Sequence, residues 1–224
     1  MSDIEPIQLK TYDPAGHDSL ANVDYGEVMR YGGMMLSRGS VAPDEELSEG
    51  TGSVRMLIDE CMEEARPVLN YKVCYRHVRV GWDGDMPVMP FDVHGSRAFA
   101  RIMKGCTEAV LMAATVGVGI DRLIAKYNRI SPSKALIMQA LGAERVEAAC
   151  DLFGDGIKAE MAARGLGCRP RFSPGYGDLP LTVQKEFMVL LDCGHLVGIT
   201  LNESLLMSPS KSVTAVIGCF PNDA

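Results

Sequence analysis

The chain has 224 residues, of which 47% are hydrophobic and 23% are charged, and its formal net charge is −7. This length suits one large domain or two small ones with a sizeable core. The acidic balance argues against nucleic acid as the main partner, because no run of lysine and arginine forms a patch that could follow a phosphate backbone.

Residues 1–50 are rich in Gly, Asp, Ser and Pro and show no sustained hydrophobic period. We interpret them as a meandering N-terminal arm that carries one short helix within 19–33. The remaining stretch, 51–224, is expected to form a single mixed domain.

After the arm, segments with helical and with strand periodicity alternate, without a repeated unit. Apolar residues spaced three and four apart predict a helix over 53–69, and "YKVCYRHVRV" over 71–80 alternates as a strand covered on both sides. Further helices are expected over 96–105, 120–130, 131–165 and 181–192, and further strands over 106–117, 196–201 and 212–220. The pattern predicts strands flanked by long helices, which is an α+β arrangement.

The longest of these helices has recognisable start and break signals. Ser131 is expected to cap it, with Pro132 at the first helical position. We expect the helix to bend or break at Gly154–Gly156, because glycine is a poor helix former.

The cysteines and the apolar runs indicate the compartment. The longest apolar run, 109–120, is too short to span a bilayer, and residues 1–16 have neither the basic nor the apolar segment of a signal peptide. Seven cysteines without a CxxC pair predict a reducing compartment, in which the thiols serve as small apolar residues. We therefore expect a cytoplasmic protein that does not bind a membrane.

The segment "RFSPGYGDLPLTVQ" over 171–184 contains the strongest candidate for a ligand site. Arg171 can hold a carboxylate with two parallel hydrogen bonds. Pro174 stiffens the turn, Gly175 lets the backbone approach a ligand, and Tyr176 offers a flat ring and a hydroxyl. A rigid structural turn is the alternative explanation.

Three carboxylates precede this segment on the long predicted helix. Glu144, Glu147 and Asp151 are three and four residues apart, so they share one helix face, and Arg145 lies one residue off it. Such a face is usually solvated, but it could also offer acceptors to a cationic or hydroxylated ligand. Carboxylates and Arg171 together would suit a ligand that resembles an amino acid.

Two motifs, in this order, resemble the activation (reactivation) domain of cobalamin-dependent methionine synthase. The first is Arg-x-x-x-Gly-Tyr within "RPRFSPGYGDLP", and the second is "LNESLLMSPSKSVTAVIG", which resembles the family's T-E-S … M-x-P … S-V-S-G segment. The helix "ALGAERVEAACD" is a weaker match, and the resemblance covers about 135–219. It implies an α+β fold with a mainly antiparallel sheet.

The resemblance also implies a function. Domains of this family bind S-adenosylmethionine in a shallow groove and dock over a corrinoid that has been oxidised to cob(II)alamin. A flavodoxin-type donor supplies an electron, and S-adenosylmethionine gives its methyl group to the cobalt. Because the family's arginine holds the ligand carboxylate, Arg171 inherits that role, and the helix before it is expected to add contacts. The implied S-adenosylmethionine-binding residues are Arg171, Phe172, Pro174, Gly175, Tyr176, Arg145 and Glu147.

The sequence departs from the family in two respects. It stops at "GCFPNDA", where the family continues into a tyrosine-bearing segment of the ligand site, and it lacks the methyl-folate, homocysteine and cobalamin modules. We therefore expect a standalone protein that acts in trans on a cobalamin-dependent methionine synthase core or another corrinoid protein, with the cobalamin carried by that partner. It would supply binding and positioning rather than a nucleophile or base. The alternative is a non-catalytic S-adenosylmethionine-binding subunit or sensor.

Two weaker motifs have simpler structural explanations. "DVHGSR" over 92–97 resembles the Asp-x-His-x-x-Gly loop of cobalamin modules, but Arg97 replaces the glycine, so we interpret it as a surface turn. "TVGVGIDR" has Gly117 and Gly119 between a strand and a helix, but Arg122 replaces the third glycine of a dinucleotide motif. The four histidines show no metal-ligand spacing, so no metal site is expected.

Overall fold

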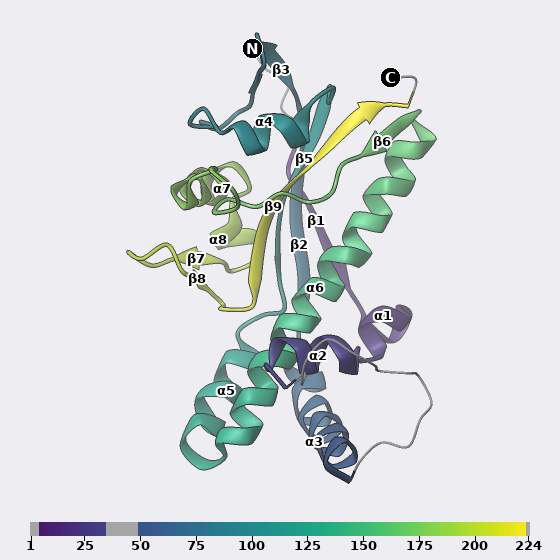
Figure 1. Cartoon of the computed structure of the whole chain (residues 1–224), viewed down its shortest axis with the longest axis vertical. Coiled ribbons are helices and arrows are strands. Elements are labelled where there is room, and N and C mark those ends of the chain that lie inside the picture. Colours follow the sequence, from purple (N-terminus) through teal and green to yellow (C-terminus); the bar gives the residue numbers. More distant parts are fainter. Residues whose placement is uncertain (1–4, 35–48, 223–224) are drawn as a thin grey trace.

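The computed structural model describes residues 5–34 and 49–222. The helices in this part of the chain pack around one central sheet (Figure 1). The sheet is five-stranded and antiparallel throughout, in the order β1-β2-β5-β9-β6. Its strands are β1 (Gln8–Tyr12), β2 (Tyr71–Arg79), β5 (Glu108–Thr115), β6 (Leu166–Cys168) and β9 (Ser212–Pro221). The α+β class and the mainly antiparallel sheet are therefore confirmed.

Helices cover both faces of the sheet. On β2, Val73 and Tyr75 pack towards the long helix, whereas Cys74 and Val78 pack on the opposite face. This arrangement is why the strand alternates in sequence yet is buried almost throughout. The long helix, α6 (Pro132–Ala163), covers one face (Figure 1). The other face carries the short helices α4 (Arg97–Met103), α7 (Gln184–Leu190) and α8 (Cys193–Leu196).

Helix α6 begins as predicted but does not break. Ser131 caps it by accepting a hydrogen bond from the Lys134 backbone N–H at 3.4 Å, and Pro132 follows at the first position. The predicted break at Gly154–Gly156 is wrong, because the helix continues unbroken to Ala163. Its buried side chains around the glycines, Phe153, Ile157 and Met161, pack on the sheet. That burial outweighs the roughly 1 kcal/mol that each helical glycine costs relative to alanine.

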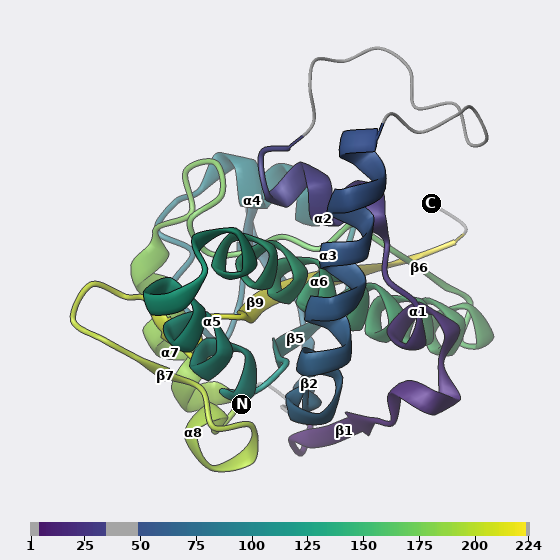
Figure 2. The ribbon, with the colours of Figure 1, turned by 90° about the horizontal axis from the view of Figure 1, so that it is seen from below.

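The N-terminal half of α6 is surrounded by helices rather than by the sheet (Figure 2). A second hydrophobic core forms there, in which buried side chains such as Ile58, Ile124 and Leu141 meet. The helices that contribute to it are α1 (Asp18–Ala21), α2 (Tyr25–Tyr31), α3 (Glu49–Ala65) and α5 (Gly119–Ile130).

The prediction of a meandering arm missed a strand. β1 pairs with β2 at the edge of the sheet, and Gln8 lies opposite Tyr75. Its side chains are mostly exposed, so the sequence shows no apolar alternation that would reveal it. The single short helix expected within 19–33 is instead two helices, α1 and α2, after a 3-10 turn at Pro14–Gly16. Residues 35–48 of the predicted arm lie outside the described residues.

The C-terminal third also differs from prediction. The helix expected over 181–192 is a 3-10 turn, Leu181–Val183, followed by α7. The strand expected over 196–201 is wrong for most of its length, because Gly198 has a φ of +72° and interrupts the extended backbone. The remaining short elements are the 3-10 turn Arg66–Val68, the hairpin of β3 (Gly81–Asp83) and β4 (Met86–Val88), and the pair β7 (Thr200–Leu201) and β8 (Met207–Ser208).

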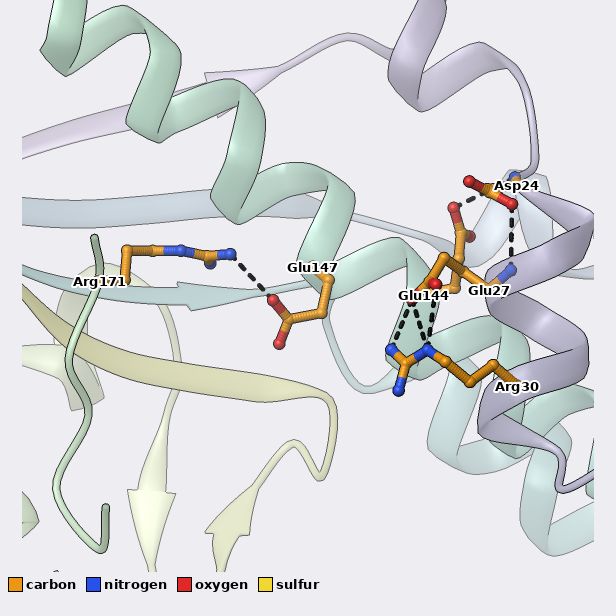
Figure 3. Close-up of polar contacts among 6 residues, drawn as sticks. All are labelled: Asp24, Glu27, Arg30, Glu144, Glu147 and Arg171. Atoms are coloured by element: carbon orange, nitrogen blue, oxygen red, sulfur yellow. Dashed lines mark hydrogen bonds and ion pairs between the residues drawn. The ribbon is translucent and has the colours of Figure 1, made fainter. Parts of the chain in front are cut away.

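A buried ion pair ties the N-terminal segment to α6. Glu144 and Arg145 are 4% and 1% exposed and bind each other through two hydrogen bonds. The Arg145 Nη1 also donates to the Leu20 carbonyl oxygen at 3.0 Å, and Glu144 accepts from the Asp24 backbone N–H at 3.3 Å (Figure 3). The expectation that Glu144 lies on an open face with its neighbouring carboxylates is therefore wrong, because the α1–α2 segment covers it.

We predict that Glu144→Ala will destabilise the fold by about 3–5 kcal/mol, because it leaves Arg145 as an unpaired buried charge. Urea unfolding followed by circular dichroism would measure the loss. The matched control is Asp155→Ala on the same helix, which removes an exposed ion pair with Lys158 and should cost less than about 1 kcal/mol. Equal losses in the two variants would contradict the assigned role of Glu144.

Candidate functional site

A groove of about 520 Å³ lies between α6 and the segment that follows β6. Its volume falls within the range of small-molecule binding sites. One face of α6 forms one wall and residues 168–173 form much of the other. The lining residues are Glu147, Cys150, Asp151, Gly154, Lys158, Cys168, Arg169, Pro170, Arg171, Phe172, Ser173, Tyr176, Val213 and Ile217.

A bulge at the edge of the sheet directs Arg171 into this groove. The backbone N–H of Arg169 donates to Gly218 at 2.8 Å, and that of Phe172 donates to Val216 at 2.9 Å. Two residues, Pro170 and Arg171, therefore lie opposite the single residue Ile217. An extra residue of this kind bends a strand and re-aims its side chains. Figure 3 shows the Arg171 side chain extending from this segment towards α6.

Two carboxylates of α6 hold the Arg171 guanidinium. Its Nη2 donates to Glu147 Oε2 at 3.0 Å and to Asp151 Oδ1 at 2.7 Å (Figure 3 shows the first bond). Arginine has five N–H donors, so the Nη1 and Nε positions can still donate to a ligand carboxylate. The groove therefore offers a fixed positive charge directly beside two negative ones.

The thiol of Cys150 lies in the same groove. Burial is the largest effect and raises its pKa to about 12, outweighing the nearby Arg171 guanidinium, which lowers it. A thiol with such a pKa stays protonated near neutral pH and is a poor nucleophile. Cys150 therefore lines the groove as a neutral side chain near neutral pH.

Tyr176 presents an aromatic ring at the mouth of the groove. It is 68% exposed, and its ring centroid lies 6.4 Å from that of Phe172. Phe172 in turn contacts Phe99 of α4 at 5.7 Å between centroids, so the pair is anchored in the core. An exposed ring in a fixed position can stack on a planar ligand group.

Pro174 and Gly175 shape the turn and do not line the groove. Pro174 is buried, and Gly175 has a φ of +91°, a conformation that side chains disfavour. The Gly175 backbone N–H donates to Leu179 at 2.9 Å. The positive φ and this hydrogen bond explain why the turn carries a glycine at this position.

Asp178 fastens the same loop to the start of α4. Its carboxylate accepts from the Ser96 hydroxyl and from the backbone N–H groups of Arg97 and Ala98, at 2.9 and 3.1 Å. The hydrogen bond from Ser96 contributes most to lowering the pKa of Asp178. The loop that carries Tyr176 is thus pinned by an ionised side chain at neutral pH.

Arg145, the last of the predicted site residues, lies apart from the Arg171 groove. It contributes to a second groove of about 780 Å³, which is lined by α6 and the α1–α2 segment. Its guanidinium is engaged by Glu144 and by backbone carbonyls, so it supports the fold beneath this surface. The two grooves share Glu147 and Asp151 and therefore adjoin.

Sequence analysis missed several lining residues of the Arg171 groove. Gly154 and Lys158 follow Asp151, which the sequence had already placed on the candidate face, at intervals of three and four residues, so helical spacing alone puts them on the same face. Gly154 faces open space, because a Cβ there would meet no atom within 4 Å. Tyr25, Tyr31 and Arg55, which line the second groove, lie far away in sequence and carried no such signal.

The weaker motifs have structural roles. In "DVHGSR", Asp92 accepts from the His94 backbone N–H at 2.7 Å in a turn that leads into α4. At Gly119 an added Cβ would lie 2.3 Å from the Val68 carbonyl oxygen, so glycine permits close packing there. Among residues 5–34 and 49–222, no group of three or more His, Cys, Asp or Glu side chains could hold a metal ion. No helix in this part of the chain has the length and apolar character needed to cross a membrane.

Comparison with known proteins identifies the fold. The sequence matches no family model and, at a significant level, no curated protein. The structure is similar to a crystal structure of the MetH reactivation domain bound to AdoHcy, with a TM-score of 0.74 over 99% of this chain and 80% of that chain. The fold is that of a methionine synthase reactivation domain. The two chains are 14% identical, so this similarity establishes the architecture that the two sequence motifs implied.

Proposed function

We propose that this protein binds S-adenosylmethionine in the Arg171 groove and supports the reductive methylation of cob(II)alamin on a corrinoid partner. One observation carries the proposal. The protein has the fold of a reactivation domain, and in its groove Arg171 binds two carboxylates through Nη2 alone. The other N–H groups of Arg171 could donate to a ligand, and the exposed ring of Tyr176 lies at the mouth of the same groove. The solved domain of similar fold contains AdoHcy, which differs from S-adenosylmethionine by the transferred methyl group.

The charges of the groove match those of the ligand. S-adenosylmethionine has a carboxylate, an ammonium group and a sulfonium, so it needs one cationic and at least one anionic partner. Arg171 would hold the carboxylate, and Glu147 and Asp151 would face the positive groups. Tyr176 would lie against the adenine ring.

The partner would carry the chemistry. Cobalamin held by a methionine synthase core or another corrinoid protein would provide the cobalt that accepts the methyl group, and a flavodoxin-type donor would supply the electron. The residues of this chain would bind and orient S-adenosylmethionine, because positioning is the contribution that the groove can make. The protonated Cys150 fits this role, since no nucleophile is needed from this chain.

We predict that Arg171→Ala will weaken S-adenosylmethionine binding by about 1.5–3 kcal/mol, the contribution of hydrogen bonds to a charged group. Isothermal titration calorimetry would measure this as a loss of roughly 10- to 150-fold in affinity. The matched control is Arg129→Ala on α5, an exposed arginine outside the groove, which should bind like the wild type. Wild-type protein that fails to bind at millimolar ligand would refute the site.

We predict opposite effects of Gly154→Ala on stability and on binding. Alanine should stabilise α6 by roughly 0.8–1 kcal/mol relative to glycine. Its methyl group would enter the open groove and should weaken S-adenosylmethionine binding by about 1–3 kcal/mol through overpacking. Gly156→Ala, at an exposed position on the same helix, should stabilise equally and leave binding unchanged. Thermal unfolding and calorimetry would separate the two effects, and equal affinities of both variants would contradict the groove assignment.

The test of the whole function is reactivation in trans. The protein alone should not consume S-adenosylmethionine. Added to a cob(II)alamin-loaded methionine synthase core with a low-potential electron donor, it should restore methylcobalamin, which ultraviolet–visible spectra would follow.

Recovery should require S-adenosylmethionine and should fall sharply with Arg171→Ala or Tyr176→Ala, but not with Arg129→Ala. Tight ligand binding without recovery on any corrinoid protein would assign the non-catalytic sensor role instead. Recovery with a different corrinoid protein would keep the mechanism and change the partner.

A further inference from the structure

A third groove, of about 900 Å³, lies on a different part of the molecule. It is bounded by the β3–β4 hairpin, by α4 and by the turn at 105–107, and it shares no lining residue with the other two grooves. Its lining residues are Trp82, Gly84, Asp85, Met86, Arg97, Ala100, Arg101, Lys104, Gly105, Cys106 and Thr107. The proposed function uses none of them.

Three cations line one wall of this groove. Arg97 and Arg101 are one turn apart on α4, and Lys104 lies at its end, so their backbones span about 10 Å at 1.5 Å per residue. All three side chains are exposed, and none makes a hydrogen bond or ion pair with any other residue within 5–34 and 49–222. Asp85 is the single acidic residue among those that line the groove.

The cluster lies on an acidic protein, whose net charge is −7. Several other basic side chains have carboxylate partners. Examples are the pairs Arg30–Glu27, Lys134–Glu60, Lys158–Asp155 and Arg164–Glu108. The helix dipole does not explain the cluster either, because Arg97 stands at the N-terminal end of α4, where a positive charge is unfavourable.

An aromatic ring completes the groove. Trp82 is the only tryptophan in the sequence and is 38% exposed. Its indole N–H donates to the Cys106 carbonyl oxygen at 3.0 Å, which fixes the ring at the edge of the hairpin. A fixed indole face beside three cations is suited to a ligand that combines a planar base with several negative charges.

We propose that this groove binds a nucleoside polyphosphate. The base would stack on Trp82, and the phosphate chain would lie along Arg97, Arg101 and Lys104. The length of the cationic row favours linked phosphates over a single anion, and arginine guanidinium groups match phosphate oxygens with paired donors. This binding is independent of the S-adenosylmethionine site.

The experiment is a titration of the full-length protein with ATP at low ionic strength, without divalent cations. Trp82 fluorescence reports directly from the groove, and calorimetry provides a second measurement that does not depend on the indole. ATP should give a saturable change, whereas adenosine should not. Arg101→Gln should weaken ATP binding about tenfold, as expected for the loss of a charge-assisted contact. It should leave S-adenosylmethionine binding unchanged.

The matched control is Arg129→Gln, which changes the net charge equally on an exposed arginine of α5 outside the groove. It should bind ATP like the wild type. Equal weakening by the two substitutions would show diffuse electrostatic attraction and overturn the site. The absence of binding by both methods at about 10 mM ATP would also overturn the site, because a dissociation constant above this concentration corresponds to less than about 3 kcal/mol of binding free energy.

Two further ligands test the details. Saturating S-adenosylmethionine should leave the ATP curve unchanged, and displacement would place ATP in the Arg171 groove and refute the proposal. Tripolyphosphate should bind more weakly than ATP, because it lacks a base to stack on Trp82. Equal affinities of ATP and tripolyphosphate would overturn the role of the indole.

Discussion

The structure depends on the packing of a single long helix against the sheet. Phe153, Ile157 and Met161 of α6 are fully buried on β2, β5 and β9, and this contact keeps the helix continuous through two glycines. Because successive faces of a helix point in different directions, the same packing fixes where the groove face of α6 points. Contacts made by other residues of α6 therefore set the positions of Glu147, Asp151 and Gly154.

Pairing between Arg171 and two carboxylates sets the electrostatics of the groove. Arg171 is 23% exposed, and Glu147 and Asp151 compensate its positive charge by forming ion pairs with it. When a ligand binds, these three side chains can replace their contacts with one another by contacts with the ligand. No buried charge is then left unpaired, which would be costly. An amino-acid ligand has the complementary pattern of charges, whereas a simple anion or cation would satisfy only half of the site.

The two grooves for which we propose ligands differ in character. The Arg171 groove mixes both signs of charge and contains a glycine that leaves space, whereas three of the four charged residues that line the groove beside Trp82 are cations. Arg169 lies between them, since it lines the first groove and donates to the Lys104 carbonyl oxygen at 2.8 Å. The strand segment that presents Arg171 is therefore attached directly to the helix that carries the cationic row.

Features that depend only on neighbouring residues could be predicted from the sequence. Alternation in β2, the Ser131 cap and the turn at Gly175 are local, and the two ordered motifs pointed to the fold. Which carboxylates of one helix are buried could not be predicted in this way, because it depends on contacts between distant segments. Glu144 and Glu147 have the same local spacing, but Glu144 is covered by a segment 120 residues away, whereas Glu147 stays available to Arg171. Helical periodicity sets the direction of a side chain, whereas its burial and its charge partners depend on the distant segments that pack against it.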